Sequence, residues 1–188
     1  MPSDRPPSPT ALLREEHQLI LSVADALSRV LAIDSPGGPP AVDTVEGCTT
    51  FFRLFADACH HSKEENLLFP ALEAHGMSRD AGPIAVMLYE HEQGRALVQA
   101  MVELLEQVRA GIRGSEPDLR TASSNFVALI TSHIAKEDGI LFDMADHLIQ
   151  GPACDTLCAA YAELADERYE GHSKQDLVDL AAEILEAG

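Results

Sequence analysis

The stretch HHSKEENLLF at residues 60–69 recurs without a gap as HIAKEDGILF at residues 133–142. Each copy begins with a histidine and has a glutamate four residues later, His60 with Glu64 and His133 with Glu137. Side chains four positions apart lie one turn apart on the same face of an α-helix. The repeat therefore predicts two helices that each present an imidazole and a carboxylate on one face.

Four helical segments surround and include this repeat. Apolar residues recur at three- and four-residue spacing between Gly- and Pro-rich breaks at residues 35–40, 76–82, 111–117 and 151–152. Four such segments with short connections predict an all-α, up-down antiparallel four-helix bundle over residues 10–150. We expect residues 1–9 to be a flexible lead, and residues 151–188 to be a C-terminal helical extension that packs on the bundle or on a second copy.

Each predicted helix carries a histidine near the middle of its apolar stripe. The first stripe contains Leu13, His17, Ile20, Ala24, Leu27 and Leu31; the third contains Ile84, Met87, His91, Gly94, Val98, Met101, Leu105 and Val108; the fourth contains Phe126, Ile130, His133, Glu137, Ile140 and Met144. The second stripe points through His61 and Glu65 instead of His60 and Glu64. Because His61 aligns with Ile134 in the other copy, the repeat favours His60 and Glu64 as the functional pair.

Six donors converge in such a bundle, and they are His17, His60, Glu64, His91, His133 and Glu137. Four imidazoles and two carboxylates are too many for one metal ion, whereas two ions bridged by both carboxylates would each keep one open position. Mixed imidazole and carboxylate donors favour transition metals over calcium or magnesium. We expect two such ions with an oxo or hydroxo bridge, and iron, manganese and zinc all fit these donors.

Some of these residues can also be interpreted as ordinary structural or surface residues. A single mid-helix histidine is ordinarily a hydrogen-bonded core residue, but burying four imidazoles and two carboxylates without a metal would be costly. We expect His61 to support the site or lie exposed, with ligation as the alternative, and Glu65 and Asp138 to accept hydrogen bonds or lie at the surface. Tyr89 either gates the site or lies exposed, and Gly94 leaves room for an exogenous ligand.

Composition excludes several classes of function. The chain has 188 residues, with 13 Lys and Arg against 31 Asp and Glu and a formal charge of −18. This balance argues against nucleic acid or an anionic membrane as partner. The N-terminus lacks the apolar segment of a secretory signal, and the cysteines at 48, 59, 154 and 158 match no disulfide or zinc pattern. We therefore expect a cytoplasmic protein with free thiols.

The motifs together resemble the hemerythrin-like HHE cation-binding domain over about residues 10–150. The stretch from Gly76 to Met87, ahead of Glu90 and His91, is also similar to the di-iron proteins that repair iron–sulfur centres. We expect this protein to lack their small cysteine-bearing N-terminal domain. The resemblance implies the same six ligands that the spacing selects, and it implies two non-haem iron ions in preference to manganese or zinc. Oxygen-carrying hemerythrins have a further histidine where this chain has Arg95, so the site resembles the four-His, two-Glu type associated with reactive chemistry.

The sequence thus leads to two functional expectations. The first is a di-iron protein that binds or reduces O2, peroxide or nitric oxide. If it is an enzyme, it is an oxidoreductase acting on peroxide or nitric oxide with an external electron donor, because no dinucleotide loop or iron–sulfur cysteine cluster is visible. The alternative is a non-enzymatic oxygen or iron sensor, store or carrier. A homodimer through the C-terminal helices is compatible with either.

Overall fold

The computed structural model describes residues 8–32, 41–164 and 167–187, and every regular element among them is helical. Tyr169 and His172 form only an isolated bridge. The predicted all-α fold is confirmed. In chain order the elements are α1 (Ala11–Ala32), α2 (Val42–Phe51), η1 (Phe52–His61), η2 (Glu64–Leu68), α3 (Phe69–Ala74), α4 (Gly82–Arg109), α5 (Ser115–Lys136), η3 (Glu137–Leu141), α6 (Phe142–Leu148), α7 (Pro152–Glu163) and α8 (Lys174–Ala187), where η marks a π-helical segment.

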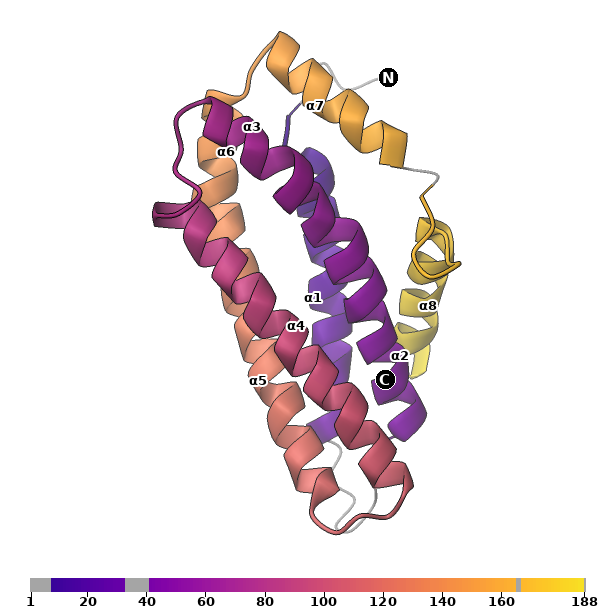
Figure 1. Cartoon of the computed structure of the whole chain (residues 1–188). Coiled ribbons are helices and arrows are strands. Elements are labelled where there is room, and N and C mark those ends of the chain that lie inside the picture. Colours follow the sequence, from indigo (N-terminus) through magenta and orange to yellow (C-terminus); the bar gives the residue numbers. More distant parts are fainter. Residues whose placement is uncertain (1–7, 33–40, 165–166, 188) are drawn as a thin grey trace.

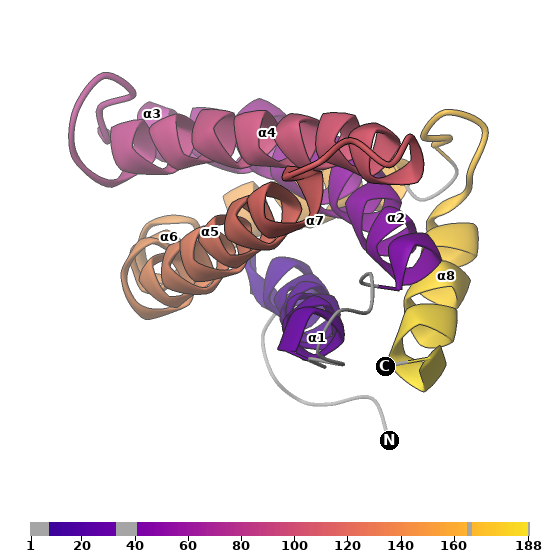
Figure 2. The same cartoon turned by 90° about the horizontal axis from the view of Figure 1, so that it is seen from below.

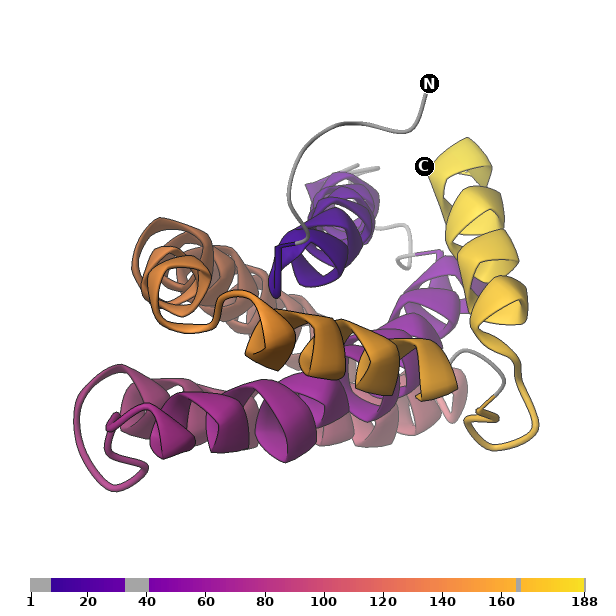
Figure 3. The same ribbon diagram turned by 90° about the horizontal axis from the view of Figure 1, so that it is seen from above.

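Four long helical rods form the body of the molecule. They are α1, the continuous run from α2 to α3, α4, and the run from α5 to α6 (Figure 1). The two end views show the rods around a common interior (Figures 2 and 3). Neighbouring rods contact one another in the order α1, α5, α4, α2 and back to α1.

The expected breaks begin helices where the structure describes them. Gly82 has a φ of +71° and precedes Pro83 in the first turn of α4, and Gly114 has a φ of +93° directly before α5. Positive φ is accessible to glycine at little steric cost, and proline is tolerated in the first helical turn. The break at residues 35–40 and most of the expected lead lie outside the described residues.

The interior consists of two apolar clusters with a polar layer between them. Along α1, Leu13 belongs to one cluster and Ile20 to the other, and the buried His17 lies between them. Along α4, His91 separates Met87 from Val98 in the same way. The bundle therefore holds its histidines at mid-depth, with apolar packing on both sides.

The expected stripe of the fourth helix is wrong beyond Glu137. Ile140 is 55% exposed and Met144 is 37% exposed, while Leu141, Phe142 and Ala145 are buried. A π-helical turn closes its hydrogen bonds five residues apart instead of four, so it accommodates an extra residue. The π segment η3 therefore shifts the buried face by about one position relative to an uninterrupted α-helix.

The two C-terminal helices lie against the four rods. Helix α7 crosses one end of the bundle, and Leu157 and Tyr161 join the apolar cluster there (Figures 1 and 3). Helix α8 lies alongside α2 and buries Leu177 and Ile184, whereas Leu180 is half-buried. Among the described residues, no helix combines the length and apolar character needed to cross a bilayer.

Candidate metal centre

The six predicted donor residues meet in the polar layer, and each is at most 2% exposed. The donor atoms of these residues and of His61 form two groups, and within each group all atoms lie within 4.8 Å of one another. We call the first the inner group, and it consists of His17, His60, Glu64 and Glu137. We call the second the cavity group, and it consists of His61, Glu64, His91 and His133.

Glu64 is common to both groups, and His61 is the donor that the repeat did not select. His61 is 6% exposed, so it is neither at the surface nor remote from the other donors. Its ring stacks on His91 with centroids 3.9 Å apart. Sequence reasoning left its role open, and the structure brings it to the cavity group.

The π-helical segments explain how one helix presents both His60 and His61. His60 and His61 end η1, and Glu64 begins η2. In a regular α-helix two consecutive side chains point about 100° apart, so only one of them would face the site. The wider π turn lets both imidazoles and Glu64 point inward, which is why the local stripe and the repeat disagreed about this helix. π-Helical turns occur frequently at functional sites.

Several donor atoms of the layer are buried and lack a hydrogen-bond partner. They are Nε2 of His17, Nε2 of His60, and both carboxylate oxygens of Glu64 and of Glu137. A buried polar atom without a partner costs free energy, and a buried charge costs more. Because these atoms face one another from three of the four rods, they fit a cationic metal centre that would satisfy them together.

The opposite nitrogen of each imidazole has a carboxylate partner. The Nδ1 to oxygen distances are 2.9 Å for His17 with Asp138, 2.9 Å for His60 with Glu16, 2.7 Å for His91 with Glu65 and 3.0 Å for His133 with Glu90. A carboxylate on Nδ1 fixes the tautomer and the ring orientation of a histidine whose Nε2 binds a metal. All four rings are therefore oriented with Nε2 toward the centre of the layer.

Two of these partners were expected and two were missed. The sequence analysis gave Glu65 and Asp138 as hydrogen-bond acceptors or surface residues, and the structure shows them as acceptors, but it did not select Glu16 or Glu90. Each missed residue directly precedes a predicted donor, which was an available signal. The pairing itself is not local, because Glu90 supports His133 on the neighbouring helix instead of the adjacent His91.

The two glutamates lie between the imidazoles of the two groups. Glu64 approaches His60 Nε2 at 3.5 Å with Oε1 and His91 Nε2 at 3.4 Å with Oε2. Glu137 Oε2 lies 3.2 Å from His17 Nε2 and 3.3 Å from His133 Nε2. Neighbouring donors around one ion, each about 2.1 Å from it, are separated by about 3 Å at right angles. These donor atoms are therefore close enough to share metal ions, and each of the two carboxylates lies near imidazoles of both groups.

The same crowding controls protonation of the metal-free layer. Burial alone would lower the pKa of His17, but its hydrogen bond to Asp138 and the nearby Glu137 carboxylate outweigh that effect and raise the pKa to about 9. His91 behaves likewise: burial opposes the charge, and the nearby Glu64 carboxylate and the hydrogen bond to Glu65 raise its pKa to about 9. In contrast, burial and the neighbouring His91 hold the pKa of His61 well below its ordinary value, so its imidazole is neutral.

A buried ion pair supports the inner group. Lys63 is 3% exposed and donates from Nζ to Glu16 Oε1 at 3.0 Å and to the Cys59 carbonyl at 2.8 Å. Lys174 of α8 reaches the same carboxylate at 2.6 Å. Burial alone would raise the pKa of Glu16, but the hydrogen bond to His60 and the charges of the two lysines lower it to about 2. Glu16 therefore stays ionised and connects His60 to the C-terminal extension.

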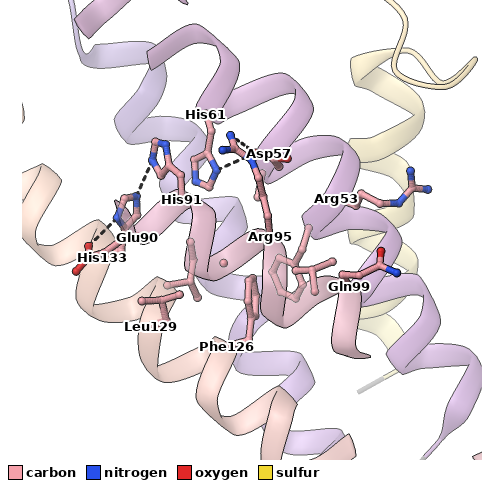
Figure 4. Close-up of a pocket in the computed structure, with 15 residues that line it drawn as sticks. Arg53, Asp57, His61, Glu90, His91, Arg95, Gln99, Phe126, Leu129 and His133 are labelled. Carbon is pink, nitrogen blue, oxygen red and sulfur yellow. Dashed lines mark hydrogen bonds and ion pairs between the residues drawn. The ribbon is translucent and has the colours of Figure 1, made fainter. Parts of the chain in front are cut away.

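The cavity group borders a pocket, which Figure 4 shows with its lining side chains. The cavity has a volume of about 340 Å³, and His61, His91 and His133 line one end of it. Arg95 occupies the position of the additional hemerythrin histidine. It donates to Asp57 at 2.8 Å and to Glu65 at 2.6 Å, so it supports the site from outside. Gly94 lies on the inner face beside this space, as expected, whereas Tyr89 is 64% exposed.

Comparison with known proteins identifies the family of this chain. Two curated relatives match parts of the chain: iron–sulfur cluster repair protein YtfE of Musicola paradisiaca is 33% identical over 89 residues, which cover 46% of this chain and 40% of that protein. Iron–sulfur cluster repair protein DnrN of Neisseria gonorrhoeae is 35% identical over 86 residues, which cover 44% of this chain and 54% of that protein. The match thus spans about half the length of these relatives. The model of the hemerythrin HHE cation-binding domain matches residues 8–145, and the chain therefore belongs to this cation-binding family.

Proposed function

We propose that this protein holds two non-haem iron ions in the polar layer and binds or reduces O2, peroxide or nitric oxide there. His17 and His60 would hold one iron, His91 and His133 the other, and Glu64 and Glu137 would bridge them. The observation that carries this proposal is the arrangement of the imidazoles: each Nδ1 is occupied by a carboxylate, while the buried glutamate oxygens between the rings lack partners.

An iron pair with an open position supplies binding and two-electron reduction of a small ligand. The chain contributes the environment for this chemistry. The carboxylates on Nδ1 orient the rings, and the ionised Glu64 and Glu137 offset the positive charge of the metals. The apolar clusters on either side of the layer limit the access of water. The protein itself provides no visible electron donor, so turnover would depend on an external reductant.

His61 is the residue on which the ligand count depends. We assign it a supporting role, because the other copy of the repeat has Ile134 at its position and because its ring stacks on His91. The competing assignment is a fifth imidazole ligand, which would fill the open position on the cavity side. Replacement of His61 by alanine separates the two assignments, since only ligation predicts the loss of an iron.

A non-enzymatic sensor, store or carrier is the alternative function. One contact favours it: Lys174 on α8 binds the carboxylate that orients His60. Iron binding at His60 would then change how the C-terminal extension packs, and α8 would report the state of the metal centre. A homodimer through the C-terminal helices and a cytoplasmic location remain predictions under either function.

Turnover separates the two functions. The iron-loaded protein would be mixed in turn with O2, hydrogen peroxide and nitric oxide in the presence of ascorbate as reductant. Steady consumption of peroxide or nitric oxide, well above that by protein loaded with zinc, is the expected result. A reversible optical change without consumption would favour the sensor, store or carrier and contradict the enzymatic proposal.

A further inference from the structure

The cavity beside His61, His91 and His133 is much larger than a diatomic ligand requires. Its volume is about 340 Å³. One water molecule occupies about 30 Å³ in the liquid, and O2 or nitric oxide needs a similar space. The cavity thus has about ten times the room that such a ligand needs, and it falls within the range of about 300–1,000 Å³ that is typical of sites for small organic molecules.

The walls of the cavity favour an apolar ligand body. Phe52, Val98, Phe126 and Ile130 are buried side chains that line it, with Leu129 beside them. In Figure 4 the imidazoles lie at one end, while Phe126 and Leu129 extend away from them toward Gln99. A molecule in this space would place one end at the metal centre and the rest of its surface against hydrocarbon.

The charged side chains at the cavity argue for a neutral ligand. Arg95 is paired with Asp57 and with Glu65, and Arg53 is paired with Glu170. An anionic ligand would have to displace one of these carboxylates to gain an arginine partner. A neutral molecule keeps all of these ion pairs intact.

A glycine keeps the cavity open close to the imidazoles. Gly94 lies one turn after His91, and a Cβ atom built on it would meet only Leu129 Cδ2, at 3.9 Å. No close backbone approach therefore requires glycine at this position. A larger side chain would extend into the space next to His91, so Gly94 preserves room where the organic part of a ligand would begin.

We propose that this cavity binds the apolar body of a neutral organic hydroperoxide and directs its O–O end toward His61, His91 and His133. The proposal rests on the proposed function, since peroxide is one of the ligands expected at the open position. It adds a substrate class, because hydrogen peroxide alone would leave most of the cavity unused.

Binding is tested with an alcohol that has the shape of the hydroperoxide but no oxidising bond. The probe is 2-phenyl-2-propanol, the alcohol of cumene hydroperoxide, titrated calorimetrically into the zinc-loaded full chain. We expect wild-type protein to bind it and Gly94→Leu to bind it at least about 10-fold more weakly, a loss of about 1.4 kcal/mol. Gln93→Leu adds the same side chain at the adjacent exposed position and is expected to bind the probe like wild type.

A graded variant and a second readout keep the test decisive. Gly94→Ala fills less of the cavity and is expected to weaken binding by less than Gly94→Leu. In the iron-loaded protein, Gly94→Leu is expected to slow consumption of cumene hydroperoxide about 10-fold more than it slows consumption of hydrogen peroxide. Circular dichroism and metal content would verify that each variant is folded and loaded.

The outcomes distinguish this inference from the proposed function. A chain that holds two irons and consumes hydrogen peroxide, but does not bind the alcohol or binds it equally well with leucine at position 94, would overturn the inference alone. A chain that holds no iron would overturn the proposed function and, with it, the assignment of the cavity to a hydroperoxide.

Discussion

The inner group and the cavity group are built from the same kinds of residue but differ in what surrounds them. In the inner group, His17 stacks on Phe142 with centroids 5.1 Å apart, and His60 is connected through Glu16 to the buried Lys63. In the cavity group, His91 and His133 face a space of about 340 Å³. Two similar donor sets can therefore have different roles: the inner group is packed as a fixed support, whereas the cavity group is where a ligand can approach.

The largest expected effect comes from the residue that both groups share. Glu64 belongs to both donor sets, so Glu64→Ala is expected to weaken binding of both irons by more than about 10-fold. Glu137 also lies near imidazoles of both groups, and Glu137→Ala should act in the same direction. Metal content after dialysis measures the effect. Two irons retained in both variants would contradict the bridging role of these carboxylates.

Single-histidine variants should separate the two groups. His17→Ala removes an imidazole of the inner group and His133→Ala one of the cavity group, so each is expected to retain about one iron per chain. His61→Ala should retain two irons and alter only the binding of exogenous ligands. If His61→Ala also retained a single iron, His61 would be a ligand, and the open position would not face the cavity.

Removing a carboxylate that orients an imidazole should destabilise the fold more in the inner group than in the cavity group. Glu16→Gln and Glu65→Gln each remove a carboxylate from an Nδ1 atom, and each is expected to weaken metal binding about 10- to 100-fold. Glu16→Gln also leaves Lys63 buried without its ion pair, an effect of about 3–5 kcal/mol. Thermal unfolding of the metal-free variants should show a large loss for Glu16→Gln only. Equal losses would remove this distinction between the groups.

One histidine of each group, His17 and His91, should titrate over the same pH range. The pKa values of His17 and His91 are raised from 6.5 to about 9 in the metal-free fold. Their protonation therefore stabilises that fold fully below about pH 6.5, and the stabilisation is lost as the pH rises through 9. Because each metal ion must displace one of these protons, the affinity for each ion should increase with pH by up to about 10-fold per unit between these values, and the product of the two affinities by up to about 100-fold. Zinc titrations in two buffers of different ionisation enthalpy should detect about two released protons, and a pH-independent affinity would exclude this coupling.

The smallest expected effect concerns glycines in two helices. A Cβ on Gly94 meets only an ordinary contact, whereas a Cβ on Gly47 lies 3.4 Å from Ile184 of α8. Alanine in a helix is more favourable than glycine by about 0.5–1 kcal/mol. Gly94→Ala should therefore raise the melting temperature of the metal-free chain more than Gly47→Ala does. The reverse order would show that the cavity wall is packed more tightly than the contact with α8.

The helical rods were predicted well because they depend on simple spacing, and the stripes of α1 and α4 are buried nearly as expected. The repeat selected His60, Glu64, His133 and Glu137, the stripes selected His17 and His91, and the structure places these six residues in one polar layer. Their role as metal ligands stays a prediction. The π turns could not be read from the stripes, since nothing in the pattern marks a turn with five-residue hydrogen bonding. This is why Ile140 and Met144 were placed inward and why the position of His61 was left open.

The partners of the imidazoles were harder to predict than the imidazoles themselves. Asp138 and Glu65 adjoin the repeat and were considered, but Glu90 supports a histidine on another helix. The connection from Lys174 to Glu16 joins residues at opposite ends of the chain. Such pairings depend on how the rods rotate against one another, and periodicity within one helix carries no information about that rotation.

The central claim of two metal ions in one polar layer is tested most directly by metal identity and stoichiometry. Elemental mass spectrometry on freshly purified protein, before and after dialysis, gives both values. The account predicts about two iron atoms per chain that survive dialysis. One zinc atom per chain, or no metal that survives dialysis, would contradict it and would require a structural or regulatory role for the same residues.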